Sequence, residues 1–367
     1  MTYIISAICA VSLFYLAPDN EYMYMTKYAP LFYLLLVILI VADGFKNFKF
    51  KPERLSCYDH KIIKTAEWVS WIFVPVILIL IFNDINVLRS VDLATYRLEG
   101  DWYGTGLLKG GIFLSLCIYI SELFFVPQFF FFYLLSKKEV SKGLKLRLFV
   151  ASFSFVFMTL LFAGRDGIVY WVMNALIFYL LLKNIYTTEI QKILKKGAVV
   201  VVSILAVPML AISAARFFLT GSLSISEIVT PFVDYGGQAP HVFCQSFYIN
   251  SEDISGYDIK NMSDFAKQSL GLYLGWTFGT FVKSLVWSFG PWGGLAVAFV
   301  LNILSRITVI MNNHKHDIWS FFLLVMLFQI PFWGVFYYRQ AMNNMYLVNL
   351  VFAVVCIFMF TRQRNQV

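Results

Sequence analysis

Three arginines stand at the ends of long apolar segments, where charged residues are few. Arg165 lies in a short turn between two such segments, and Arg216 and Arg339 each follow one. A guanidinium is always charged and forks onto phosphate oxygens. Three of them meeting at one depth could bind a single anion, such as a diphosphate at a membrane surface. Each could instead extend to lipid headgroups or pair with an acid, as Arg165 could with Asp166.

A reaction at such an anion would also need a base to deprotonate a hydroxyl. His241 is the first candidate, because a histidine titrates near neutral pH. Asp234 or Glu227 could do the same if partly buried, and His241 could equally be an exposed loop histidine. Gly236 and Gly237 precede it and would allow close backbone approach or a tight turn. The candidate catalytic residues are His241 and Asp234, and the candidate substrate-binding residues are Arg165, Arg216, Arg339, Lys283 and Tyr338.

Several other chemistries lack their sequence signals. The chain has no Gly-Lys-Ser/Thr phosphate loop and no Gly-x-Ser-x-Gly elbow. The loops expected outside the membrane carry no Asp-x-Asp pair of the kind that holds a divalent metal. The five cysteines are scattered, which disfavours zinc and a disulfide framework. We therefore expect no metal and no cofactor.

Composition places these residues in a membrane protein. Apolar residues make up 60% of the chain and charged residues 14%, against about 25% charged in a soluble domain. Mean hydropathy is +0.73. Such a chain cannot cover a water-facing surface, and it is too hydrophobic to be disordered. The net charge of +8 does not require nucleic acid, because membrane proteins concentrate Lys and Arg in cytoplasmic loops.

The hydrophobic pattern predicts an all-α polytopic protein with ten spans of about 20 residues each. They are 3–17, 28–43, 67–83, 107–135, 148–163, 167–183, 197–215, 289–305, 318–337 and 345–361. The fourth is too long for one straight span, so we expect a kink at Pro127, a strong tilt, or two short segments. The first lacks a basic start and a small-residue cleavage site, so we expect it to be retained.

Basic residues orient these spans. Loops 44–66, 136–147 and 183–196 carry six, five and four of them, and Arg306, Lys315, Arg362 and Arg364 bring the total on one face to 19 of 29. That face is predicted to be cytoplasmic, with both termini on it. The same bias makes 271–289 a re-entrant or interfacial segment on the outer face. Residues 1–367 are then one integral membrane domain, with an outer loop and re-entrant segment over 216–290.

This layout resembles a known family. Ten or more spans, a large outer loop in the second half and Phe-Ala-Gly-Arg165-Asp-Gly in an outer turn are similar to bacterial oligosaccharide repeat-unit polymerases, the O-antigen polymerases of Wzy type. Ala-Ala-Arg216-Phe resembles the arginine that opens the large loop of that family. The stretch 280–294 resembles its Phe-Gly-x-x-Gly segment. O-antigen ligases share the same layout.

The resemblance implies a metal-independent glycosyltransferase of the C type in the bacterial inner membrane. Its donor and acceptor would be undecaprenyl-diphosphate-linked glycans on the periplasmic face, and a chain-length regulator protein is an implied partner. Arg165, Arg216 and Arg339 would stabilise the leaving diphosphate. Trp276, Trp287 and Trp292 could line a groove for sugars and prenyl chain, or could form an interfacial aromatic belt. The alternatives are an O-antigen ligase and a lipid-linked oligosaccharide flippase or other transporter.

Overall fold

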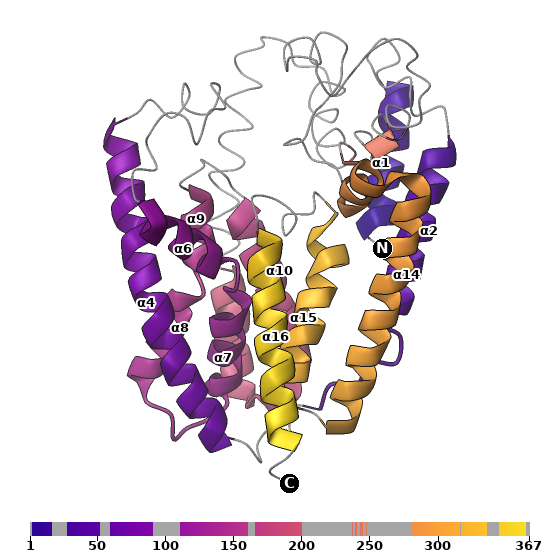
Figure 1. Cartoon of the computed structure of the whole chain (residues 1–367). Coiled ribbons are helices and arrows are strands. Elements are labelled where there is room, and N and C mark those ends of the chain that lie inside the picture. Colours follow the sequence, from indigo (N-terminus) through magenta and orange to yellow (C-terminus); the bar gives the residue numbers. More distant parts are fainter. Residues whose placement is uncertain are drawn as a thin grey trace. The chain divides into compact units, whose positions relative to one another are not determined.

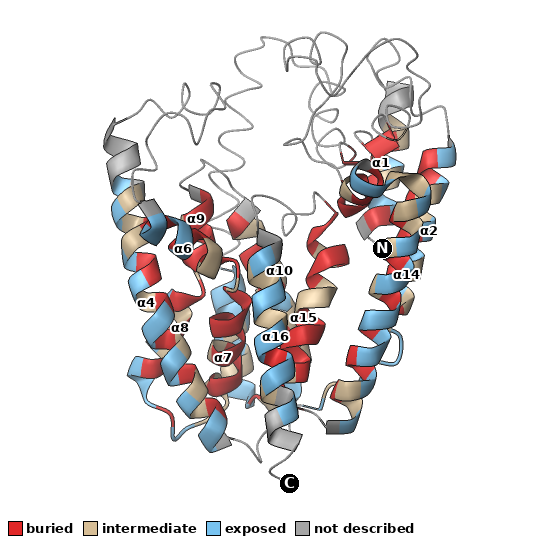
Figure 2. Ribbon diagram, viewed as in Figure 1, coloured by how far each residue is buried: buried red, intermediate tan, exposed pale blue. Residues whose placement is uncertain are grey.

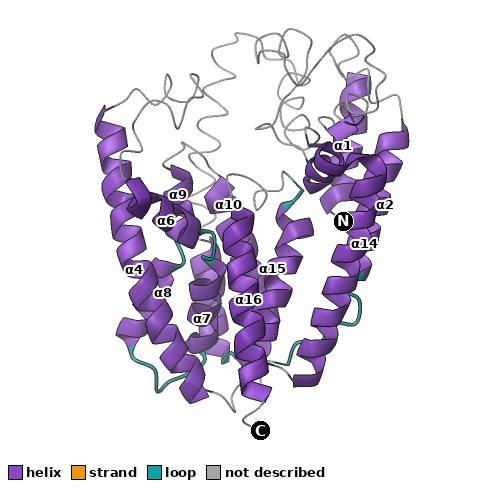
Figure 3. Cartoon of the chain, in the orientation of Figure 1, coloured by secondary structure: helices purple, strands orange, loops and turns teal. Residues whose placement is uncertain are grey.

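The structure is a computed structural model of the chain. It describes residues 2–16, 28–51, 59–90, 111–160, 166–199, 237, 239–240, 243–244, 247, 280–315, 317–335 and 345–364. Within these residues the regular elements are helices and there are no strands, as Figure 3 shows. The fold class is therefore all-α, as the sequence predicts.

The chain divides into two compact units. Unit 1 comprises residues 1–49 and 203–367, and unit 2 comprises residues 50–202. Unit 1 contains α1 (Thr2–Leu16), α2 (Tyr28–Asp43), α14 (Phe281–Lys315), α15 (Ile318–Trp333) and α16 (Met345–Arg364). Unit 2 contains α4 (Asp59–Ser90), α6 (Gly111–Ser121), α7 (Phe125–Leu135), α8 (Lys142–Ala151), α9 (Ser154–Leu160), α10 (Asp166–Leu182) and the 3-10 turn η3 (Lys183–Ile185). Residues 188–199 are also helical. Figure 1 labels the helices.

Helices long and apolar enough to cross a membrane are present among the described residues. They are His60–Asn83, Gly167–Ile185 and Ser288–His314, with the bent pair α6 and α7 as a candidate fourth. Shorter apolar helices cover Tyr3–Ser12, Ala29–Asp43, Ile318–Trp333 and Leu347–Met359. Helices thus overlap every predicted span except 197–215, most of which lies outside the described residues.

The overlong fourth segment is broken, and Pro127 is not the break. The chain bends by 48° between α6 and α7. The amides of Glu122, Leu123 and Phe124 donate to carbonyls three residues earlier, so a tight turn interrupts the helix. Pro127 lies in the first turn of α7, where its missing N–H has no helical acceptor to lose. The expected kink at Pro127 is therefore wrong, and the alternative of two short segments is confirmed.

The predicted span 148–163 is also interrupted, between α8 and α9. The Ser152 hydroxyl donates to the Phe149 carbonyl at 2.6 Å and accepts from the Trp171 indole of α10 at 3.0 Å. A serine that bonds back to its own helix offers the backbone an alternative to the helical ladder and bends it.

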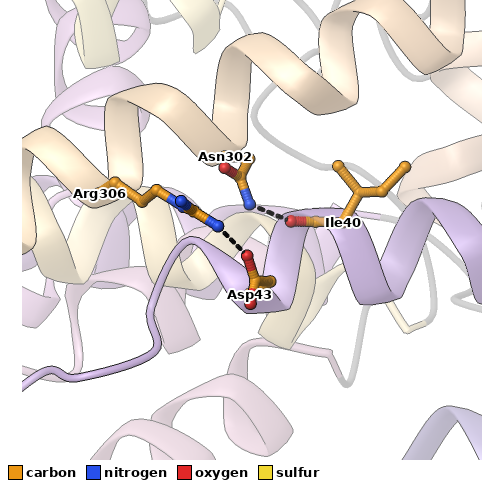
Figure 4. A network of polar contacts seen from close by, with 4 residues as sticks. All are labelled: Ile40, Asp43, Asn302 and Arg306. Carbon is orange, nitrogen blue, oxygen red and sulfur yellow. Dashed lines mark hydrogen bonds and ion pairs between the residues drawn. The ribbon is translucent and has the colours of Figure 1, made fainter.

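In unit 1, α15 packs against both α14 and α16, and α2 packs along α14. Figure 2 shows α15 buried along most of its length, while α16 exposes much of its surface. Two of the polar contacts between α2 and α14 lie at the end of α2. The Arg306 guanidinium donates to the Asp43 carboxylate, and the Asn302 amide donates to the Ile40 carbonyl (Figure 4). The sequence analysis places Arg306 among the basic residues of the predicted cytoplasmic face. In the structure its guanidinium forms an ion pair with Asp43 of the neighbouring helix α2.

Candidate anion site at the start of α14

A glycine separates the first turns of α14 from the span that follows. Gly290 has φ 69° and ψ 174°, a backbone conformation that is open essentially to glycine alone. Pro291 follows it, and its carbonyl accepts from the Tyr33 hydroxyl of α2. Figure 1 shows the first turns of α14 at an angle to the rest of the helix. Gly290 therefore separates residues 280–289 from the helix that follows, and the re-entrant or interfacial placement of 271–289 on the outer face stays a prediction.

The break folds these turns back onto the helix. A Cβ placed on Gly294 would lie 3.5 Å from the Leu285 carbonyl carbon. In a straight helix these two residues would be about 13 Å apart, at 1.5 Å per residue. The Phe-Gly-Pro-Trp-Gly-Gly run over 289–294 is thus the sequence of a tight reversal. A Cβ at Gly294 would be in van der Waals contact with that backbone and would lie 3.0 Å from the Tyr33 hydroxyl.

Lys283 lies on the folded-back segment and is buried. Its side chain is 8% exposed, and its ammonium nitrogen has no hydrogen-bond partner among the described residues. Lys283 precedes the candidate span Ser288–His314. Burial alone lowers its pKa from 10.5 to about 8, with no neighbouring charge contributing. A buried charge normally requires a paired opposite charge, and no described residue supplies the anion that would offset the desolvation of this ammonium.

One further donor lies three residues before Lys283 in the sequence. Thr280 is fully buried, and its hydroxyl has no hydrogen-bond partner among the described residues. The helix begins at Phe281, so the first amides of α14 have no acceptor inside the helix. The Phe281 amide is satisfied by the Gly334 carbonyl at 2.8 Å, and the Lys283 amide by the Thr280 carbonyl at 2.9 Å. A helix start with a cation and a hydroxyl is an arrangement that binds phosphate-like anions.

Apolar packing makes this a dry environment. Phe281, Val282, Leu285 and Val286, which surround Lys283 in sequence, belong to one buried cluster. The cluster includes side chains of α1, α2, α15 and the outer loop: Tyr3, Ala10, Leu31, Leu34, Val37, Phe243, Cys244 and Ile330. The Tyr3 ring meets the Phe281 ring edge-on at 6.4 Å. A low local dielectric strengthens any interaction between the ammonium and an anion.

The described residues of the predicted outer loop pack against the same cluster. A Cβ on Gly237 would lie 2.6 Å from the Ala10 amide nitrogen, so the loop backbone touches the backbone of α1. The expected close backbone approach at this glycine is confirmed. Phe243 stacks on Tyr33 at 6.3 Å, and Phe247 meets the same ring at 5.2 Å. The described neighbours of His241 on either side therefore pack in the core that holds the start of α14.

The remaining predicted site residues lie outside the described part of the chain. They are Arg165, Arg216, Asp234, His241, Tyr338 and Arg339, together with Trp276. The convergence of the three arginines stays a prediction. Of the tryptophans, Trp292 is 85% exposed and does not line a buried groove.

Sequence reasoning selected Lys283 but missed Thr280. The signal was available, since a hydroxyl followed three residues later by lysine opens an apolar helical run. Among the described residues no group of three or more His, Cys, Asp or Glu could hold a metal ion. No protein-family model, curated protein or solved structure matches this chain.

Proposed function

We propose that this chain is a polymerase of undecaprenyl-diphosphate-linked oligosaccharide repeat units, and that Lys283 binds the diphosphate of one lipid-linked substrate. The observation that carries the proposal is a buried ammonium at the start of a helix, with no hydrogen-bond partner among the described residues. A diphosphate supplies the charge that this position lacks and accepts from the Thr280 hydroxyl. The proposal includes ten spans, both termini in the cytoplasm, and this site on the periplasmic face.

The backbone conformation of residues 280–294 supports the proposal that this stretch corresponds to the Phe-Gly-x-x-Gly segment of the polymerase family. Gly290 makes the reversal, and the reversal buries Lys283 while keeping it outside the following span. A segment of this kind places a cation at headgroup depth, where the diphosphate of a prenyl lipid lies. Ligand sites in membrane proteins commonly use such helix starts to face anionic groups.

The proposed reaction is a glycosyl transfer between two lipid-linked glycans. The acceptor hydroxyl oxygen bonds to the anomeric carbon of the donor, and the bond from that carbon to the diphosphate oxygen breaks. The hydroxyl proton passes to His241 or Asp234, and free undecaprenyl diphosphate leaves. Arg165, Arg216 and Arg339 join Lys283 in stabilising the charge that develops on the leaving diphosphate. The activated lipid bond supplies the energy.

The test is reconstitution of the full chain with a purified lipid-linked repeat unit, followed by a gel for a product ladder. We expect Lys283→Gln to remove the ladder and Lys283→Arg to retain part of it. Lys46→Gln, which removes an exposed lysine at the end of α2, should give the ladder of the native protein. A native ladder from Lys283→Gln would refute the role of Lys283 as the diphosphate ligand.

The three arginines are tested in cells. Arg165→Ala, Arg216→Ala and Arg339→Ala should each leave single lipid-linked units while the protein stays in the membrane, and Arg→Lys should also impair the reaction. Normal polymer in all three would refute the arginine clamp. Accumulation of long lipid-linked polymer would instead identify a ligase, which transfers the same donor to a lipid-core acceptor.

A further inference from the structure

A second basic site lies in unit 2, where α8 packs against α4. The connection from α7 to α8 and the start of α8 are rich in positive charge. Residues 137–147 contain Lys137, Lys138, Lys142, Lys145 and Arg147, with Glu139 as the one acid. The positive-inside rule accounts for such charge in general. It does not account for how Arg147 is held.

Arg147 lies on an aromatic ring. Its guanidinium carbon is 4.8 Å from the centre of the Trp71 ring of α4. Its Nε is buried and has no hydrogen-bond partner in the described part of the chain. The Trp71 ring therefore holds the guanidinium against α4, with the buried Nε out of reach of a ligand. The two terminal nitrogens of a guanidinium are the pair that can fork onto a phosphate.

The surface of α4 beside Arg147 combines charge and aromatic rings. Lys64, Trp68 and Trp71 follow one another at helical spacing and are exposed, the two tryptophans by 65% and 60%. The stripe continues with exposed Leu78 and Phe82 toward the other end of the candidate span His60–Asn83. This order matches the one expected along a lipid from headgroup to acyl chain: a lysine first, then tryptophans, then other apolar side chains.

A glycine leaves room on the facing helix. Gly143 stands one turn before Arg147 on α8, and no described atom lies within 4 Å of the position that a Cβ would occupy there. Lys142 directly precedes Gly143, and both Lys142 and Lys64 are exposed. The open position thus lies one helical turn from Arg147 on α8 and next to an exposed lysine.

We propose that the seam between α4 and α8 binds an anionic phospholipid of the adjoining leaflet. Its phosphate accepts from Arg147 and Lys64, its headgroup occupies the space over Gly143, and its acyl chains run along Trp71, Leu78 and Phe82. The lipid is a structural ligand, separate from the glycan substrates proposed for unit 1. A basic pocket between spanning helices is the usual form of such a site.

The experiment compares lipids on the purified full chain by native mass spectrometry and thermal unfolding. Phosphatidylglycerol should remain bound and raise the unfolding midpoint, and phosphatidylcholine with the same acyl chains should do so less. Loss of one basic contact at the membrane surface corresponds to about a fivefold drop in affinity, which we expect for Arg147→Gln. Inorganic phosphate should have no effect, because it lacks the acyl chains.

Two variants complete the test. Gly143→Trp fills the open position without removing charge and should also abolish the preference for phosphatidylglycerol. Lys192→Gln removes an exposed lysine of the helical residues 188–199 and should retain it. Equal retention of the two phospholipids by the native protein would overturn the proposal, and so would a native preference in Gly143→Trp. If Arg147→Gln does not fold, the lipid preference of Gly143→Trp alone decides the proposal.

Discussion

The chain interrupts its helices in two different ways, one in each unit. In unit 1, α14 is broken by the special backbone of Gly290, and the turns before the break carry a buried cation with no hydrogen-bond partner among the described residues. In unit 2, α6 and α7 are separated by three ordinary residues in a tight turn. There Phe124 is fully buried and stacks on Phe155 of α9 at 5.0 Å.

The difference separates a break made by the backbone from one held by packing. The turn at 122–124 needs no unusual dihedral angle, so the rings packed against it decide where the helix stops. The reversal at 290 needs a glycine, and it holds the Lys283 ammonium where no described residue offsets its charge. We therefore regard the turn at 122–124 as structural and propose that the reversal at Gly290 serves the diphosphate site.

The largest effect on stability is expected from Phe124→Ala. Truncating a fully buried phenylalanine should lower the free energy of unfolding by about 3–5 kcal/mol, because it leaves a cavity and the neighbouring side chains lose their contacts with the ring. Unfolding in mixed detergent micelles measures it. Phe113→Ala, at a side chain that is 77% exposed on α6, should change it by no more than about 0.5 kcal/mol. Equal losses of unfolding free energy in Phe124→Ala and Phe113→Ala would show that packing does not hold the turn between α6 and α7.

Gly290→Ala should cost about 1–3 kcal/mol, because a Cβ is strained at this backbone conformation. The same variant should shorten the glycan ladder, since the reversal positions Lys283. Gly197→Ala is the matched control. It lies in the helical residues 188–199, where a Cβ would meet no described atom within 4 Å, and alanine there should stabilise by about 0.5–1 kcal/mol. If both alanines stabilise, the reversal at Gly290 does not need a glycine.

Binding of a diphosphate should depend on pH through Lys283. Its pKa in the folded protein is about 8, so the ammonium that binds the anion is lost as pH rises above that value. Affinity for farnesyl diphosphate should then fall by about tenfold per pH unit. Without ligand the sign is opposite, because the unfolded chain keeps the proton up to 10.5 and stability rises with pH in that window. Titration calorimetry across this range tests it, and an unchanged pH dependence in Lys283→Arg would contradict it.

The smallest effect is expected from Pro127→Ala. The proline sits in the first turn of α7 and loses no hydrogen bond there, so stability should change by less than about 1 kcal/mol. The 48° bend between α6 and α7 should remain, as distances between spin labels on the two helices would report. A straightened α6–α7 pair would mean that the proline, and not the packing of Phe124, makes the break.

The sequence predicted the apolar segments well and the breaks inside them less well. Apolar runs of spanning length can be read directly, because the bilayer demands them. Pro127 was the obvious local cause for a kink, yet Phe124 and Phe155 come from helices that only the fold brings together. The close approach at Gly237 was foreseen as a property of glycine. Its partner, the backbone of α1 at Ala10, was not.

The residues of the candidate site were likewise predictable only in part from the sequence. Residue type alone marked Lys283 as an unusual charge in an apolar segment, since ionisable residues are costly near a membrane. Composition and hydropathy likewise determined that the protein is helical and suited to a bilayer. Only the tertiary structure decided that Lys283 is buried with no hydrogen-bond partner in the described part of the chain, and that Arg147 lies on the Trp71 ring. Burial and pairing depend on which segments, distant in the sequence, come into contact. A local sequence pattern does not specify those contacts.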